Sequence, residues 1–164
     1  MNNVSFRIAE AGDLPFIVHV YNESIPDRQA TADLKPVTVA SKRAWFKAHD
    51  SKRPLWLVLL NGQRAGWIGL EDFYGRPAYQ QTAEVSIYID YRFHQRGLGQ
   101  AALSHVLQAA PGLGLHHLLA FIFSHNRPSQ RLFIRNGFSR YGHLPEVAKM
   151  DDRLRSLDIL GRRV

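Results

Sequence analysis

The segment at residues 95–101, Gln-Arg-Gly-Leu-Gly-Gln-Ala, constrains the fold of this chain more than any other. A strand-like apolar run ends just before it, and a helical apolar pattern begins inside it. Glycines let a backbone approach an anion closely, and the free amides of a first helical turn point outward with the positive end of the helix dipole. The sequence therefore predicts a strand-loop-helix unit that can hold a diphosphate, with Arg92 and Arg96 nearby; the alternative is a plain tight turn.

The residues around this loop predict a parallel pair of strands. Residues 82–90 are dense in β-branched residues and predict a central strand. From residue 97 the apolar spacing predicts a helix that stops at Pro111-Gly112, and residues 117–123 form the next apolar strand. A strand, a crossover helix and a second strand imply parallel pairing.

The rest of the chain adds antiparallel strands. Residues 55–60 and 64–74 flank Asn61-Gly62, the strongest short hairpin signal. The other expected elements are a strand near residues 6–8, a helix capped by Asp13, a helix from Thr38 that buries Ala44, Trp45 and Ala48, a helix at 126–136 ended by Gly137, and strands at 138–143 and 157–160. The predicted class is α+β (mixed α/β): a mixed, mostly antiparallel sheet with one parallel pair and helices on both faces.

Length and composition bound the function. With 164 residues, 45% of them hydrophobic, the chain is expected to form one domain over 1–164. It has no apolar run of about 20 residues and no signal-like start, so we expect a cytoplasmic protein without a membrane partner. The sequence contains no cysteine, which excludes disulfides and cysteine nucleophiles. Its eight histidines lack metal-ligand spacing, so no metal is expected.

A net charge of +7 indicates an anionic partner, either nucleic acid, a membrane surface or a phosphorylated cofactor. Arg127, Arg131 and Arg135 are spaced four apart and predict one stripe on a helix, either solvated or beside cofactor phosphates. Nucleic acid is the least favoured partner, because the basic residues lack interleaved aromatics and no binding motif is present.

Two separated motifs relate the chain to a known family. The first is the loop pattern Gln/Arg-x-x-Gly-x-Gly/Ala at 95–101, and the second is the segment 126–138, which runs from Asn to Gly-Phe. On these motifs the chain resembles the GNAT superfamily of acyl-coenzyme A N-acyltransferases over nearly its whole length. Within it the chain is most similar to the bacterial phosphinothricin or methionine sulfoximine acetyltransferases, on Tyr21-Asn22, Trp45-Phe46, 73–79 and 82–89.

The resemblance implies acetyl-CoA as the cofactor. The main chain of Ile87, Tyr88 and Ile89 would pair with the pantetheine arm as an added strand does, although both isoleucines also suit a sheet core. The backbone amide near Tyr88 is a candidate donor to the thioester oxygen. The remaining expected cofactor residues are Gln95, Arg96, Gly97, Leu98, Gly99, Gln100 and Ala101 for the diphosphate, Asn126 for the pantetheine, and Ser129 and Phe133 for the end of the channel.

Glu84 is the expected catalytic base. On an alternating strand it shares a face with Ser86 and Tyr88, and a carboxylate in an apolar strand is costly unless it is paired or used. The alternative is an ion pair with an arginine such as Arg76. The expected substrate-binding residues are Tyr74, Arg76, Thr82 and Glu84; a guanidinium reads carboxylates bidentately, although Arg76 also suits an exposed turn.

The sequence departs from the family at Phe133, where many members place a tyrosine as acid for the leaving thiolate. Tyr141 or a water is the candidate replacement. The segment 142–155 also differs from the glycine- and tryptophan-rich ending of the phosphinothricin type. Both departures concern the acid and the substrate rather than the reaction.

The leading functional hypothesis is an acetyl-CoA-dependent N-acetyltransferase, acting on the α-amino group of a small amino acid or analogue by direct attack in a ternary complex. The polar segment 23–35, as a lid, and Trp45-Phe46 would enclose such a substrate. A protein or peptide amine acetyltransferase is the runner-up, and a catalytically silent coenzyme A-binding module is the third alternative. The resemblance also implies a homodimer.

Overall fold

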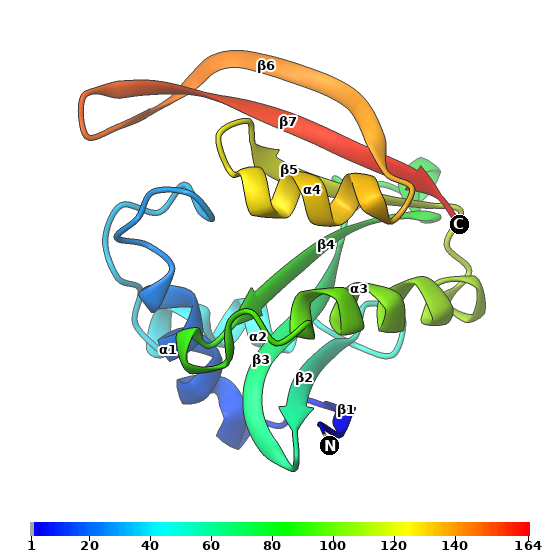
Figure 1. Ribbon diagram of the computed structural model, residues 1–164. Helices are drawn as coiled ribbons and strands as arrows, with labels where there is room; N and C mark the ends of the chain where they lie inside the picture. Colours follow the sequence, from blue (N-terminus) through cyan, green and yellow to red (C-terminus); the bar gives the residue numbers. More distant parts are fainter. Residues whose placement is uncertain (1) are drawn as a thin grey trace.

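The computed structural model describes residues 2–164 (Figure 1). Within these residues seven strands form one sheet in the order β1-β2-β3-β4-β5-β7-β6. Neighbouring strands pair antiparallel except for β4 and β5, which run parallel. The predicted mixed, mostly antiparallel sheet with one parallel pair is confirmed.

The elements follow the predicted order along the chain. The strands are β1 (Val4–Ile8), β2 (Leu55–Leu60), β3 (Gln63–Asp72), β4 (Thr82–Ile89), β5 (His117–Phe123), β6 (Ser139–Met150) and β7 (Arg153–Arg163). The α-helices are α1 (Leu14–Glu23), α2 (Arg43–Lys47), α3 (Leu98–Ala109) and α4 (Arg127–Arg135). The short 3-10 turns used below are η2 (Ala40–Lys42), η3 (Pro77–Tyr79) and η4 (Tyr91–Phe93).

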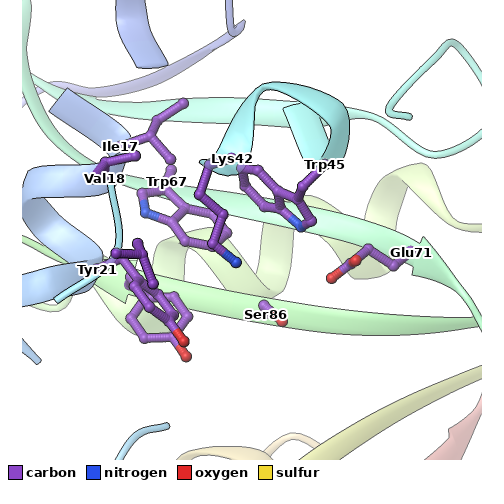
Figure 2. Close-up of a pocket in the computed structure, with 10 residues that line it drawn as sticks. Ile17, Val18, Tyr21, Lys42, Trp45, Trp67, Glu71 and Ser86 are labelled. Atoms are coloured by element: carbon purple, nitrogen blue, oxygen red, sulfur yellow. The ribbon is translucent and has the colours of Figure 1, made fainter. Parts of the chain in front are cut away.

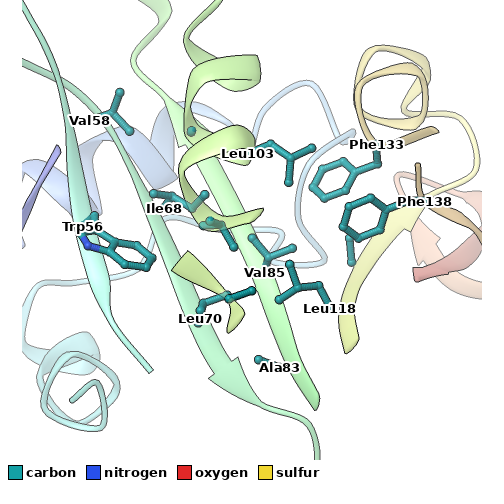
Figure 3. Close-up of a cluster of buried hydrophobic side chains, with 14 of the residues drawn as sticks. Trp56, Val58, Ile68, Leu70, Ala83, Val85, Leu103, Leu118, Phe133 and Phe138 are labelled. Atoms are coloured by element: carbon teal, nitrogen blue, oxygen red, sulfur yellow. The ribbon is translucent and has the colours of Figure 1, made fainter. Parts of the chain in front are cut away.

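Helices cover both faces of the sheet, as predicted. Leu98, Leu103 and Val106 of α3, with Phe133 of α4, belong to the larger core on one face. Figure 3 shows Leu103 and Phe133 close to Val85 of β4 in this core. On the other face, α1 packs through a second cluster that includes Trp67 of β3, and α2 packs against that cluster. Since residues alternate along a strand, β4 sends Val85 and Ile87 to the first face and Glu84, Ser86 and Tyr88 to the second.

The last two strands are longer than predicted and form an extended hairpin (Figure 1). Asp151 and Asp152 turn the chain with φ angles of 50° and 62°, which short aspartate side chains tolerate. Most side chains of β6 are exposed, so the strand lacks the apolar alternation that marks a half-buried strand. The sequence pattern therefore revealed only the parts of this hairpin nearest the core.

Two local predictions near α1 and α2 are wrong in detail. Asp13 occupies the N-cap position of α1, but its carboxylate pairs with Arg7 at 2.7 Å and accepts the Glu10 amide instead of capping that helix. The second helix begins as η2 and continues as the five-residue α2, which leaves Ala44 and Ala48 exposed. Trp45 alone of the expected set turns inward, 5.4 Å from Trp67 between ring centroids.

His105 of α3 is expected to make folding sensitive to acid. Its ring stacks on Phe6 at 4.1 Å and meets Trp56 edge-on at 4.7 Å, and burial lowers its pKa from the usual 6.5. The unfolded chain therefore binds the proton more readily, so stability falls as the pH drops below about 6.5. Between pH 7.5 and pH 5.5 the free energy of unfolding should fall less in His105→Leu than in wild type. Urea titration at the two pH values measures this fall.

The matched control for this experiment is His116→Gln, because His116 is exposed. That variant should keep the wild-type dependence of stability on pH. An unchanged dependence in His105→Leu would show that the aromatic contacts of His105 do not hold it neutral.

Candidate active site

The parallel strands β4 and β5 separate along their length. They pair only from Thr82 to Glu84, opposite His117 to Leu119. Beyond that point β4 continues to pair with β3, and β5 with β7. Within the described chain, the edge of β4 at residues 85–89 therefore has no strand partner on the β5 side. Such an edge offers its main-chain groups to an extended ligand.

A cavity of about 640 Å³ opens along this edge. The expected cofactor residues that line it are Ile87, Tyr88 and Ile89 of β4, Gly99 of α3, and Asn126, Ser129 and Phe133 at α4. The structure thus brings together residues up to 46 positions apart, from 87 to 133, around one space. Phe133 is buried and packs edge-on against Phe138 at 4.9 Å, so it forms part of the wall.

The glycine loop leads into α3 at one side of this cavity. Gly97 is the N-cap of α3 with a φ angle of 77°, a left-handed conformation that favours glycine. The helix bond from the Ala101 amide to the Gly97 carbonyl, at 3.0 Å, leaves the amides that precede it for another acceptor. At Gly99 a Cβ atom would lie 3.3 Å from Cδ2 of Leu132, so a larger side chain there would fill the cradle.

Side chains of the loop are partly engaged within the protein. The Gln100 amide donates to Asn136 at 2.8 Å and so ties α3 to α4. Arg92 pairs with the buried Asp90 at 2.8 Å. Gln95, Arg96 and the three arginines of α4 are exposed. The main-chain amides and the exposed Arg96 side chain are therefore free to meet a diphosphate, whereas the Gln100 and Arg92 side chains are engaged.

The polar segment expected to be a lid lies across this cavity. Its Gln29 carbonyl accepts the Asn126 side-chain amide at 3.2 Å, and its Ala30 carbonyl accepts the Tyr88 hydroxyl at 3.3 Å. The Asn126 side-chain oxygen meanwhile accepts the Ser129 amide at 3.3 Å and caps α4. Asn126, expected to face the pantetheine, thus also holds the segment and the helix in place.

A second, smaller cavity of about 230 Å³ lies on the α1 and α2 face of the sheet (Figure 2). Its walls include the rings of Tyr21, Trp45 and Trp67, and its polar groups include Lys42 and Glu71. Ser86 and Tyr88 of β4 line both cavities. The two spaces are therefore neighbours along the middle of β4.

Glu84 lies two residues before Ser86 on β4, outside the lining of both cavities. It is half-buried, and it shares its face with Ser86 and with its antiparallel neighbour Glu71. Burial raises the pKa of Glu84 to about 7, and the negative charge of Glu71 adds to the shift. Among residues 2–164, Arg76 and the other basic side chains make no ion pair with Glu84. A carboxyl with such a pKa can accept a proton near neutral pH.

The tyrosines of the small cavity are held in their protonated form. Burial raises the pKa of Tyr21 to about 12, and its hydroxyl bonds with Asp33. Burial also raises the pKa of Tyr88 well above its usual value. Both hydroxyls are therefore hydrogen-bond donors at neutral pH.

The structure brings none of the expected substrate residues, Glu84 included, to the lining of either cavity. Tyr74 is 77% exposed, Arg76 lies exposed just before η3, and Thr82 begins β4. Tyr141, the candidate acid, lies on β6 and packs near His117, 6.2 Å between ring centroids. These roles remain predictions from the resemblance.

Sequence reasoning overlooked Lys42 and Glu71. The pairing of β3 with β4 indicates a role for Glu71, because it places Glu71 opposite Glu84. Lys42 carries no such signal, since its position depends on how η2 packs against α1.

His19, Glu23 and Asp90 bring three potential ligand atoms within 4.8 Å of one another. Two of these residues are already engaged, since Glu23 accepts the Tyr91 amide and Asp90 pairs with Arg92. The absence of a metal stays a prediction. No helix in residues 2–164 is long and apolar enough to cross a membrane.

The splayed strands, the glycine loop and the two neighbouring cavities indicate a protein of the acyltransferase class, and comparison with known proteins agrees. Residues 4–139 match the family model described as "Acetyltransferase (GNAT) domain". The chain therefore belongs to the GNAT acetyltransferase family, as its motifs predicted. Because GNAT acetyltransferases use acetyl-CoA, this membership confirms the predicted cofactor.

Relatives and solved structures place the chain more closely. It is 46% identical to the phosphinothricin acetyltransferase-like protein YwnH of Bacillus subtilis over 98% of this chain and 99% of that one. It is 31% identical to an L-methionine sulfoximine/L-methionine sulfone acetyltransferase of Pseudomonas paraeruginosa, over 90% and 87% of the two chains. A GNAT phosphinothricin acetyltransferase of Sinorhizobium meliloti, solved with acetyl-CoA, is 26% identical with a TM-score of 0.91 over 98% and 88% of the chains.

Proposed function

We propose that this protein transfers an acetyl group from acetyl-CoA to the α-amino group of a small amino acid or analogue, by direct attack in a ternary complex. The observation that carries the proposal is that Ser86 and Tyr88 line both cavities, which makes the two cavities neighbours. The larger cavity has the unpaired strand edge and glycine loop that suit an extended, phosphorylated cofactor. The smaller has the size and polarity that suit a small zwitterion.

The larger cavity fits acetyl-CoA in three ways. The free edge of β4 at Ile87 to Ile89 can pair with the pantetheine arm, and the amides at the start of α3 can donate to a diphosphate. The space at Gly99 is one that a larger side chain would fill. When bound, acetyl-CoA supplies an acetyl group activated as a thioester. The proposed donor to the oxygen that gains charge is a main-chain amide near Tyr88. The Tyr88 amide itself points to β3, because the Asp90 amide donates to the Ala65 carbonyl and the β3–β4 register is unbroken.

Glu84 is the proposed base, acting directly or through a water. Attack requires a neutral amine, and a carboxyl with a pKa near 7 can take the proton of the acceptor. The proton thus passes from the amine to Glu84, while the thiolate leaves as coenzyme A. Phe133 cannot donate a proton, and coenzyme A thiolate is a fair leaving group without one.

The cavity of about 230 Å³ favours a small acceptor over a protein amine. Trp45 helps to enclose the smaller cavity, and the polar segment 23–35 helps to enclose the larger one. A peptide acceptor would need an open groove. Relatives named for phosphinothricin, methionine sulfoximine and methionine sulfone support the same class of acceptor.

The test is thiol release from acetyl-CoA over a panel of amino acids and analogues that includes these three compounds and lysine-containing peptides. We expect turnover with at least one free α-amino acid and none with peptides. Peptide turnover alone would favour the protein-acetylating alternative. Binding of acetyl-CoA without any turnover would favour the silent coenzyme A-binding module.

The proposal also includes a homodimer of chains that each form one domain, working in the cytoplasm. The β6–β7 hairpin exposes Tyr141, Leu144, Val147 and Leu154, an apolar surface that a second copy would cover. Light scattering on the purified protein should give the mass of a dimer, and the mass of a single chain would remove this part of the proposal.

A further inference from the structure

The small cavity has two free charges of opposite sign. Lys42 reaches it from η2, and Glu71 reaches it from β3 (Figure 2). Both side chains are half-buried, and neither makes an ion pair within residues 2–164. Charges that are partly removed from water and left unpaired in a cavity favour a ligand that brings the opposite charges.

Aromatic rings hold Lys42 in place without neutralising it. Its Nζ atom lies 5.3 Å from the centre of the Tyr21 ring and 5.7 Å from that of Trp45. Such contacts attract the ammonium through the ring faces and leave its three N–H groups available. Lys42 is therefore positioned to donate to an anionic group inside the cavity.

Lys42 is also the only cation among the described residues that line this cavity. Arg76, the residue expected to bind the acceptor carboxylate, is exposed before η3 and lines neither cavity. Glu71, with Glu84 opposite it on β4, makes the β3–β4 side of the cavity negative. The cavity can therefore compensate one anionic group but not two.

We propose that Lys42 binds the carboxylate of the acceptor and that Glu71 excludes a second anionic group, so that the enzyme selects α-amino acids with neutral side chains. The inference rests on the proposed function and names its substrate class. It predicts that methionine sulfone, whose side chain is neutral, binds more tightly than phosphinothricin, which carries a phosphinate besides its carboxylate. The faces of Trp45 and Trp67 supply the apolar contact for such a side chain.

The first experiment measures binding by calorimetry to enzyme saturated with coenzyme A, which cannot turn over. We expect Lys42→Met to weaken the binding of L-methionine sulfone by about ten- to a hundredfold. The variant should leave the weaker binding of the corresponding carboxamide, which lacks the carboxylate charge, unchanged. Lys42→Arg keeps the charge and should restore most of the affinity.

The matched control is Lys47→Met. Lys47 lies five residues further along, at the end of α2, and is exposed and outside the cavity. The Lys47→Met variant should bind methionine sulfone and its carboxamide as wild type does. Equal binding of methionine sulfone by wild type and Lys42→Met would overturn the proposal. The proposal would also be overturned if Arg76→Met, and not Lys42→Met, lost the preference for methionine sulfone over its carboxamide.

The second experiment compares the two acceptors on the same coenzyme A-saturated enzyme. Wild type should bind methionine sulfone at least tenfold more tightly than phosphinothricin. Glu71→Gln should reduce that ratio of affinities by strengthening the binding of phosphinothricin. Glu146→Gln, on the exposed strand β6, should leave the ratio unchanged. A wild-type preference for phosphinothricin, or an unchanged ratio in Glu71→Gln, would overturn the proposal.

Binding and turnover separate this inference from the proposed function. Binding that depends on Lys42, without acetyl transfer to the same amino acid, would leave the inference standing and remove the function. Acetyl transfer that does not change when Lys42 or Glu71 is replaced would leave the proposed function standing and remove the inference.

Discussion

Replacing Glu84 with glutamine is expected to lower kcat/KM for acetyl transfer by about a hundred- to ten-thousandfold, the range that a positioned general base contributes. The change preserves the size of the side chain and removes its ability to accept a proton. The affinity for acetyl-CoA should stay within about twofold, because Glu84 is absent from the residues that line the larger cavity. Steady-state thiol release and calorimetry with acetyl-CoA measure the two effects.

The pH profile gives this prediction a second readout. Only the deprotonated carboxylate can act as the base, and burial raises its pKa to about 7. The wild-type kcat/KM should therefore rise as the pH increases through about 7, and this rise should disappear in Glu84→Gln. Glu71→Gln removes a nearby negative charge, so it should move the rise to lower pH.

The control for Glu84→Gln is Glu146→Gln, which removes an exposed carboxylate on β6. It should retain wild-type activity and the wild-type pH profile. A loss of less than about tenfold in Glu84→Gln, with the rise near pH 7 preserved, would assign the base to another group.

Replacing Leu118 with alanine is expected to lower the free energy of unfolding by about 2–5 kcal/mol, the range for a fully buried leucine. Leu118 is 0% exposed and lies opposite Ala83 in the short parallel contact that joins β4 to β5. Figure 3 shows its side chain near Val85 and Phe138. The truncation would leave a cavity where the two halves of the sheet meet.

Urea unfolding monitored by circular dichroism measures this loss. The matched control is Leu34→Ala, because Leu34 is 46% exposed and lies outside the β6–β7 hairpin. That variant should change the unfolding free energy by less than about 0.5 kcal/mol. Equal losses in the two variants would mean that the contact between β4 and β5 does not depend on the packing of Leu118.

Much of the proposed cofactor site was predictable because its signals are local. The glycines of the 95–101 loop, the β-branched run before it and the helix after it are each visible within about 15 residues. Asn126, Ser129 and Phe133 came from a motif rather than from periodicity, and they line the same cavity as Ile87 to Ile89. Alternation along β4 also put Glu84, Ser86 and Tyr88 on one face, as the register of the sheet bears out.

The misplaced details are those that depend on packing. Asp13 has the right residue type and position for a cap, yet its carboxylate is taken by Arg7 from a neighbouring strand. Ala44 and Ala48 follow helical spacing, but α2 is too short to present them to the core. The outer parts of β6 were missed because an exposed strand has little apolar alternation.

The sequence by itself determined the order of the elements, the mixed sheet, the family and the glycine loop, because these follow from spacing and residue type over short stretches. Only the tertiary structure decided that β4 and β5 part after Glu84 and that a second cavity shares Ser86 and Tyr88 with the first. That cavity is built by α1, η2, α2, β3 and β4, which are distant in the chain. Its charges, Lys42 and Glu71, come together only when these elements pack, so no local pattern could have revealed them.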